Sequence, residues 1–432
     1  MTSQAHADQK AQLKRDPHFR WLMAGAALSM LGDQFTLVAL PWLVLAMTGD
    51  PLVLGTVLAI TAVPRAVFIL IGGAMVDRHS PKRVLMWTKH VNTVLLATLA
   101  ALVFLDSVSL WAVYALAFGI GLATAFSIPS ATAMLPHVVM PQHLQAANGM
   151  LLGLRQLAAF VGPLVAGLLI VLFGDGASKD VSGATGLGMA FLFDAFSFVA
   201  SAWTLSKVAT RPAAEPRIAA MREPVLRSVA SGLRSFWNDR DLRSCLLYWS
   251  AIALLISGPI QIALPLLASQ QLGGDASDFG LLIGAHGAGT LGGMVLSGMK
   301  PTLRARSFGM TILMVDAIVG LLFMPMGQVT ATWQAAALLL VIGVLGGFIQ
   351  VAIFTWIQRR VHPSMLGRAM SLFLFIFMGM APVSAAVTGW LLRSVALNAV
   401  FVGSGALLVG LVVVALSMTK ISRVSDGSPV AT

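Results

Sequence analysis

Five ionisable side chains lie roughly a third to a half of the way along apolar stretches of this sequence, and those stretches are long enough to span a membrane. The five are Asp33, Arg65, Arg155, Asp194 and Asp316. A charge at the centre of a bilayer costs at least ~2.5–3.5 kcal/mol, so such a group usually faces a cavity or a partner. A carboxylate in this position can gain and lose a proton as its surroundings change, and an arginine can pair with it or hold an acidic ligand.

Asp33 is the strongest candidate for reversible protonation. It follows Gly32 midway along the first apolar stretch, with Ser29 and Thr36 on the same helical face. Proton and substrate could compete for this carboxylate. Arg155 could be its partner, two helical turns before a Gly-Pro pair.

The remaining ionisable groups have alternative roles. Arg65 and Arg155 could each pair with Asp33 or contact an acidic substrate, and the pairing is favoured. Asp194 lies among phenylalanines, which favours a snorkelled or helix-bonded carboxylate over a site. Asp316 and His286 are weaker candidates, and His286 is expected to be a satisfied interior histidine rather than a proton relay.

The motifs of several enzyme classes are missing from the sequence. It contains no G-x-x-x-x-G-K-[ST], no H-E-x-x-H and no Cys/His cluster, and Cys245 is the single cysteine. These absences argue against an ATPase, a metalloprotease and a zinc enzyme. We therefore expect a protein that is not an enzyme, with no metal and no cofactor.

The composition predicts an all-α polytopic membrane protein. The chain is 57% hydrophobic and 10% charged, and runs of about 20 apolar residues recur along it. Twelve spans are predicted, at residues 20–47, 52–76, 84–105, 109–134, 144–173, 186–207, 243–270, 276–299, 307–327, 331–357, 365–392 and 396–419.

These spans divide the chain into two halves of six helices. Residues 20–207 form the first half and residues 243–419 the second. A polar, arginine-rich linker with three prolines occupies residues 208–242, and residues 1–19 and 420–432 are short tails.

The net charge of +11 is explained by its distribution. With the amino terminus in the cytoplasm, all but four of the 28 Lys and Arg residues fall in cytoplasmic segments; the exceptions are Arg65, Arg155, Lys179 and Arg393. This asymmetry follows the positive-inside rule and predicts that both termini are cytoplasmic. The bilayer is therefore an expected partner, and nucleic acid is not.

The loop after the second span carries a recognisable motif. Gly73, Asp77, Arg78, Lys82 and Arg83 form the pattern G-x-x-x-D-R-x-x-x-K-R, which resembles the signature loop of the major facilitator superfamily of transporters. Three further segments, 128–136, 145–150 and 156–167, and the turn at 366–372 are similar to the branch with macrolide-efflux and enterobactin-exporter proteins.

This resemblance implies a mechanical role for the charged loop. In the family, the aspartate and the basic residues of this loop hold the two halves together when the cavity opens outward. Asp77 would then meet the start of the eleventh span, where Arg368 could pair with it. The alternative is that these residues only anchor the topology at anionic headgroups.

The resemblance also extends to the fifth span. Gly162, Pro163 and Gly167 partly match a glycine-richer motif of proton-coupled exporters, which favours export over import. The alternative is a stripe of small residues that serves helix packing alone.

Together these observations predict a secondary active transporter that works by alternating access. The expected activity is proton-coupled efflux of an amphipathic drug or secreted metabolite by a monomer in a bacterial cytoplasmic membrane. One alternative is an exporter of an acidic metabolite, siderophore or lipid, since two arginines lie within spans. The other is a membrane sensor or assembly subunit that kept the fold without transport.

Overall fold

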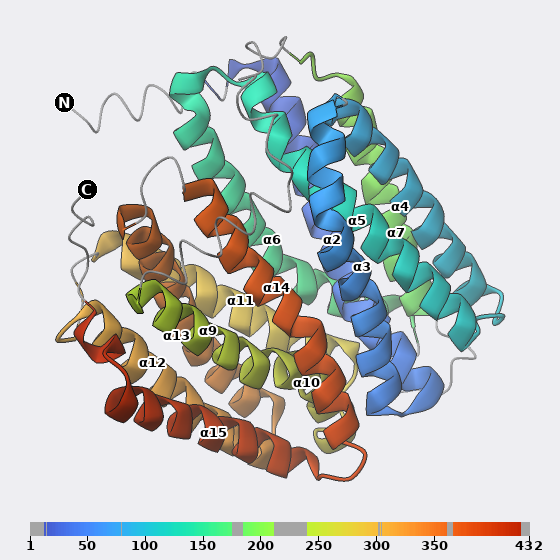
Figure 1. Ribbon diagram of the computed structural model, residues 1–432. Coiled ribbons are helices and arrows are strands. Elements are labelled where there is room, and N and C mark those ends of the chain that lie inside the picture. Colours follow the sequence, from blue (N-terminus) through green and yellow to red (C-terminus); the bar gives the residue numbers. More distant parts are fainter. Residues whose placement is uncertain are drawn as a thin grey trace. The chain divides into compact units, whose positions relative to one another are not determined.

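The protein is helical throughout the described part of the chain, which confirms the all-α prediction (Figure 1). The computed structural model describes residues 13, 15–78, 80–174, 185–210, 240–300, 303, 305–360 and 366–424. The first six long helices are α2 (Pro17–Thr48), α3 (Pro51–Arg78), α4 (Pro81–Phe104), α5 (Leu110–Val138), α6 (Leu144–Phe173) and α7 (Thr185–Ser206).

Six long helical segments follow in the second half of the chain. They are α9 (Arg240–Gly258) with its continuation through η3 (Pro259–Ala263), α10 (Leu264–Leu266) and η4 (Leu267–Gln271), then α11 (Ala276–Met299), α12 (Phe308–Phe323) with η5 (Met324–Gln328), α13 (Thr332–Arg360), α14 (Leu366–Leu391) and α15 (Leu397–Met418). Each of the twelve predicted spans corresponds to one of these segments.

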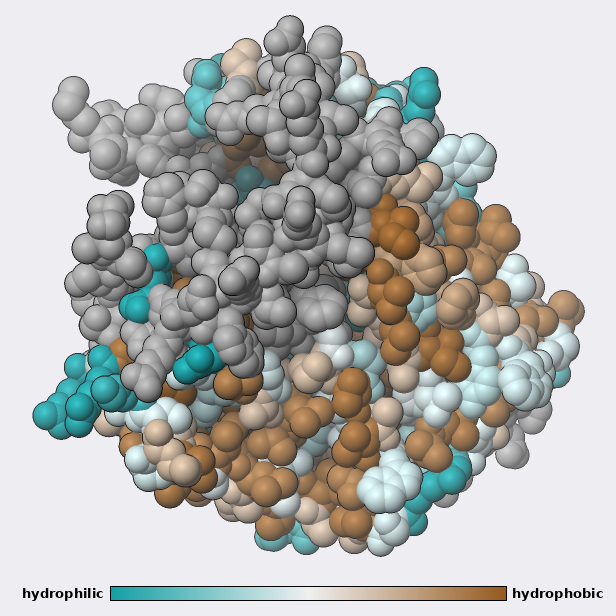
Figure 2. All heavy atoms as spheres, viewed as in Figure 1, coloured by the Kyte–Doolittle hydropathy of each residue, from teal (hydrophilic) through white to brown (hydrophobic). Residues whose placement is uncertain are grey.

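Eleven of these segments are long and apolar enough to cross a membrane, judged over the described residues by length and composition. Their outward faces carry large apolar side chains, and Figure 2 shows apolar residues over much of the coloured surface. Trp111 and Leu172, for example, are 81% and 70% exposed. An apolar exterior of this extent fits a lipid environment and supports a multi-pass membrane protein.

The chain divides into two compact units. The first unit contains Met1–Thr48 and Ile60–Arg222, and the second contains Gly49–Ala59 and Glu223–Thr432. Helix α3 therefore begins in the second unit and continues into the first.

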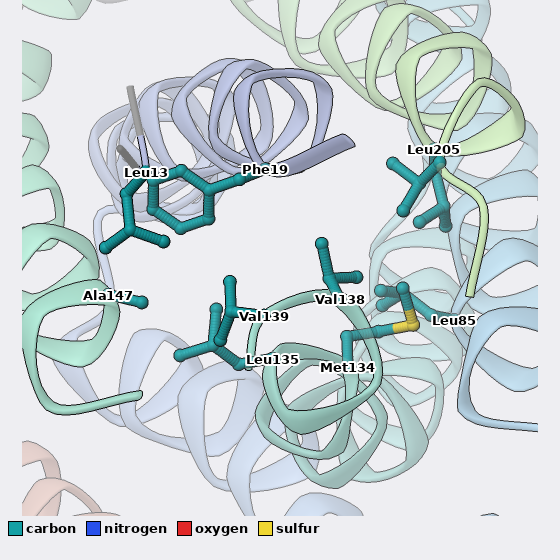
Figure 3. Close-up of a cluster of buried hydrophobic side chains, with 10 residues drawn as sticks. Leu13, Phe19, Leu85, Met134, Leu135, Val138, Val139, Ala147 and Leu205 are labelled. Atoms are coloured by element: carbon teal, nitrogen blue, oxygen red, sulfur yellow. The ribbon is translucent and has the colours of Figure 1, made fainter. Parts of the chain in front are cut away.

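In the first unit, α7 packs against α2, α4 and α6. A buried apolar cluster joins the starts of α2, α4 and α6 to the ends of α5 and α7 (Figure 3). Its members are Leu13, Phe19, Leu85, Met134, Leu135, Val138, Val139, Ala147, Leu205 and Val208. Helix starts and helix ends meet at one place, so α2, α4 and α6 run opposite to α5 and α7.

In the second unit, the long helix from Arg240 to Gln271 changes its hydrogen-bond pattern at Pro259. Proline has no N–H to donate, and the helix adopts a π-helical turn over Pro259–Ala263. Ser384 of α14 contacts the backbone at this point, since its hydroxyl donates to the Leu254 carbonyl and accepts from the Gly258 N–H at 2.6 Å. A neighbouring helix thus supplies hydrogen bonds at the irregular turn.

Helices α11 and α13 approach each other closely through glycines from both sides. A Cβ atom added at Gly289 or Gly293 would lie within 2.1 Å of a carbonyl oxygen of α13. A Cβ atom at Gly343 or Gly347 would lie within 2.3 Å of a carbonyl oxygen of α11. The close backbone contact therefore requires glycine at these positions.

An ion pair joins the start of α3 to the segment after α14. The Arg393 guanidinium donates from Nη2 and Nε to the two carboxylate oxygens of Asp50. Asp50 also accepts from the Leu52 N–H at 2.8 Å in the first turn of α3. The hydrogen bond from Arg393 holds the pKa of the Asp50 carboxyl below its ordinary value. Close backbone contacts support this pairing, because a Cβ atom at Gly389 would lie 2.6 Å from the Pro51 carbonyl oxygen.

Two neighbouring glycines of α13 allow a direct test of the helix contact. Gly347→Val should lower the stability of the protein in detergent by about 1–3 kcal/mol, because the new side chain forces α11 and α13 apart. Gly346→Val is the matched control, since a Cβ atom there has no neighbour within 4 Å. The thermal unfolding midpoint measures both effects, and equal midpoints for the two variants would contradict the proposed packing.

The Asp50–Arg393 pair predicts a pH dependence of stability. Because the pKa of Asp50 is lower in the folded protein, its contribution is present above the ordinary value of 3.8 and is lost as the pH falls through the lowered value. Asp50→Asn should therefore lower the unfolding midpoint at neutral pH, and variant and parent should converge in acid. Asp106→Asn removes a charge from another exposed turn and serves as control. A difference between parent and Asp50→Asn that does not change with pH would contradict the prediction.

Candidate functional site

Asp33 lies midway along α2 with its side chain exposed, between the buried residues Gly32 and Phe35. Two cations of other helices interact with it electrostatically, Lys89 of α4 and Arg155 of α6. The predicted pairing partner Arg155 is thus close to Asp33, and Lys89 is an additional one.

Asp194 of α7 is fully enclosed, with 1% of its surface exposed. Its carboxylate accepts hydrogen bonds from the hydroxyls of Thr36 in α2 and Ser197 in α7. Gly32 makes this approach possible, because a Cβ atom there would lie 2.5 Å from the Asp194 carboxylate and 2.0 Å from the Ser197 hydroxyl. Thr36, which the sequence places on the same helical face as Asp33, donates a hydrogen bond from its hydroxyl to Asp194.

Asp194 also belongs to the same electrostatic environment as Asp33. Asp33 and Lys89 both interact with the Asp194 carboxylate. Asp194 therefore has the helix-bonded geometry that the sequence favoured, and it also lies close to the candidate site. We call Asp33, Lys89, Arg155 and Asp194 the charged cluster.

Lys89 is the member of this cluster that sequence reasoning missed. It was counted with the cytoplasmic loop, whereas the structure places it within α4 with 7% of its surface exposed. Its ammonium lies 5.6 Å from the centre of the Phe198 ring of α7. The available signal was its position inside the predicted span 84–105, one turn before another polar residue, Asn92.

Arg65 of α3 is half-buried, and the described residues give it no ion-pair partner. The structure therefore does not bring Arg65 into the charged cluster. Its role as a contact for an acidic ligand stays a prediction.

The motif after the second span is described only in part. Gly73, Asp77 and Arg78 lie in the last turns of α3, and their side chains are outside the described residues. The side chain of Arg368 in α14 is also outside them, so the predicted pairing of Asp77 with Arg368 stays a prediction.

The two basic residues at the start of α4 are described in full. The Lys82 ammonium donates to the carbonyls of Ser206 and Val208, at 3.2 and 2.7 Å, and so binds the end of α7. Arg83 is exposed. Lys82 thus joins the start of α4 to the end of α7, because a cation at a helix C-terminus can bind the last carbonyls of that helix.

The Gly-Pro pair of the fifth span lies in a continuous α6. Gly162, Pro163 and Gly167 are all buried. A Cβ atom at Gly162 would lie 2.4 Å from Cγ of Gln34, so this glycine permits a close contact with α2. The geometry fits the packing alternative, and a role in the direction of transport stays a prediction.

The two weaker candidates of the second unit have different surroundings. Asp316 of α12 is 8% exposed and accepts a hydrogen bond of 2.9 Å from the hydroxyl of Tyr248 in α9. His286 of α11 is half-buried, and its backbone carbonyl accepts from Thr290. Tyr248, which sequence reasoning did not single out, gives Asp316 a structural partner across a helix contact. The described residues contain no group of three or more His, Cys, Asp or Glu that could hold a metal ion.

A double-mutant cycle tests the structural role of Asp316. Tyr248→Phe should lower the free energy of unfolding of the parent. In an Asp316→Leu background the same substitution should lower it less, and the difference between the two losses, on the order of 0.6–1.7 kcal/mol, is the coupling of the two side chains. Thermal unfolding in detergent measures the coupling. Tyr114→Phe changes the only other tyrosine of the chain and is the control. Equal costs of Tyr248→Phe in both backgrounds would show that the hydrogen bond contributes nothing.

The chain is similar over most of its length to known transporters. It is 22% identical to macrolide efflux protein A of Streptococcus pyogenes, over 94% of this chain and 96% of the relative. It is 30% identical to the multidrug efflux pump Tap of Mycolicibacterium fortuitum, over 52% of each chain.

Solved structures agree on the fold. The crystal structure of a bacterial homologue of the human lysosomal transporter Spinster superposes with a TM-score of 0.68, at 14% identity, over 96% of this chain and all of that one. The sequence profile of the Major Facilitator Superfamily matches residues 22–385. The described residues form twelve long helical segments, and the chain belongs to the Major Facilitator Superfamily of transporters.

Proposed function

We propose that this transporter exports amphipathic small molecules in exchange for protons, with Asp33 as the carboxylate that carries the proton. The observation that supports this most directly is the position of Asp33, an exposed carboxylate in the middle of a membrane span beside two cations. The activities of the relatives, macrolide efflux and multidrug efflux, favour export and an amphipathic substrate.

The chemistry follows from competition for one negative charge. When Asp33 is ionised, it can attract a cationic substrate from an open cavity. When it is protonated, that attraction disappears and the substrate is released. A proton gradient across the membrane would drive the cycle, because the carboxylate meets different proton concentrations on the two sides.

The proposal includes the setting of the protein. We place it in a bacterial cytoplasmic membrane, as a monomer with both termini in the cytoplasm, because the basic residues gather in the segments on that side. The two halves would alternate between inward-open and outward-open states around the cavity, as in other transporters built from internal repeats.

Transport of the cationic dye ethidium tests the coupling. In proteoliposomes with an imposed pH gradient, Asp33→Asn should reduce ethidium transport to the level of vesicles without protein, because the asparagine cannot exchange a proton. Asp316→Asn is the matched control, since it changes another carboxylate within a span while Tyr248 can still donate to the new side chain.

Three outcomes would contradict the proposal in different ways. Undiminished gradient-driven transport by Asp33→Asn would remove Asp33 from the coupling. Gradient-driven transport of an anionic dye but not of ethidium would favour the acidic-substrate alternative. If the parent transports neither dye nor a macrolide, the proposed efflux activity fails.

A further inference from the structure

We propose that Lys89 of α4 is a positioning residue that sets the proton affinity of the carboxylate pair Asp33 and Asp194. The inference rests on the proposed function, in which Asp33 carries the coupled proton. It adds a second carboxylate and a shared counter-charge to that site.

The burial of Lys89 is the first step. A lysine ammonium enclosed by apolar side chains is unfavourable unless carboxylates compensate it. Lys89 is 7% exposed, lies over the Phe198 ring, and interacts with Asp33 and Asp194. The position of this cation within α4 therefore depends on the two carboxylates.

The helices around α7 each contribute one charge to this environment. Helix α7 carries Asp194, α2 carries Asp33, α4 carries Lys89 and α6 carries Arg155. The two cations are not equivalent. Arg155 is exposed and interacts with Asp33, whereas Lys89 is enclosed and interacts with both carboxylates.

This arrangement limits how many negative charges the site holds. One ammonium, shared by two carboxylates, compensates one of the two negative charges. The other must be compensated by Arg155, by a bound proton or by a cationic substrate. Asp194 is enclosed and held by the hydroxyls of Thr36 and Ser197, whereas Asp33 is exposed, so we assign the exchangeable proton to Asp33.

Asn92 supports a polar role for this part of α4. It lies one turn after Lys89 with 4% of its surface exposed, and its side-chain carbonyl oxygen has no hydrogen-bond partner among the described residues. A buried acceptor of this kind can accept a hydrogen bond from the Lys89 ammonium or from a water molecule. The lysine then has a second place to bind when Asp33 is neutral.

Infrared spectroscopy of the purified protein tests the inference without any substrate. The stretching band of protonated carboxyl groups is followed as a function of pH, and the part that Asp33→Asn removes is assigned to Asp33. Lys89→Gln should move the midpoint of that part to higher pH by about one pH unit or more, because Asp33 loses a positive neighbour. Lys89→Arg keeps the charge and should restore most of the parent midpoint.

Lys207→Gln is the matched control. Lys207 also lies over an aromatic ring, 5.7 Å from the centre of Trp203, but it is exposed at the end of α7. The double variant Lys89→Gln/Asp194→Asn removes one cation and one anion, so it should fold and titrate with a midpoint near that of the parent. If Lys89→Gln alone does not fold, the double variant still allows the titration of Asp33 to be measured without Lys89.

The results separate failure of this inference from failure of the proposed function. If Asp33 titrates and its midpoint pH is the same in Lys89→Gln as in Lys207→Gln, the proposed role of Lys89 is wrong. The proposed coupling by Asp33 is then unaffected. If the double variant titrates far from the parent midpoint, compensation by Lys89 is also contradicted. If Asp33→Asn removes no titrating band, the proposed proton carrier itself fails.

Discussion

A hydrocarbon environment offers no hydrogen-bond partners, so a polar group buried in the spans depends on its own helix or on a neighbouring one. This constraint accounts for several contacts between helices in both units. Asp194 binds Thr36 of α2, Tyr248 binds Asp316 of α12, and Ser384 of α14 contacts the irregular turn of the helix that begins with α9. The apolar faces of the helices can contact lipid tails as favourably as they contact other helices. The polar contacts therefore add specificity to the choice of neighbouring helix.

Close approach of the backbones makes these contacts possible. Gly32 allows α2 to reach the Asp194 carboxylate, and Gly258 lies so close to α14 that a Cβ atom would be 2.1 Å from the Thr388 hydroxyl. The α11–α13 contact uses glycines in the same way without a buried charge. Small residues thus serve two purposes here, since they increase packing between helices and shorten the distance that a polar side chain must bridge.

The sequence predicted the spans and the candidate carboxylates because both depend on local composition. A run of apolar residues identifies a span, and an aspartate within it is visible without a structure. The partners of these groups were not predictable, since a helix pattern does not state which helix lies opposite. Nothing in the sequence marks Tyr248 and Ser384, because their partners lie on α12 and α9 and are known only from the structure. Lys89 was missed for another reason. It lies in the early part of the predicted span 84–105, close to the charged loop, where a basic residue is usually assigned to the membrane surface.

The three carboxylates within the spans differ in the groups that surround them. Asp194 and Asp316 are buried and accept hydrogen bonds from hydroxyl groups, so a change in their protonation would disturb contacts between helices. Asp33 is exposed, and the described residues provide it with charged neighbours rather than hydroxyl donors. Long-range compensation by Lys89 and Arg155 does not depend on one fixed geometry. A change in the protonation of Asp33, as we propose for the transport cycle, would therefore break no hydrogen bond between helices among the described residues, whereas the contacts of Asp194 would stay in place.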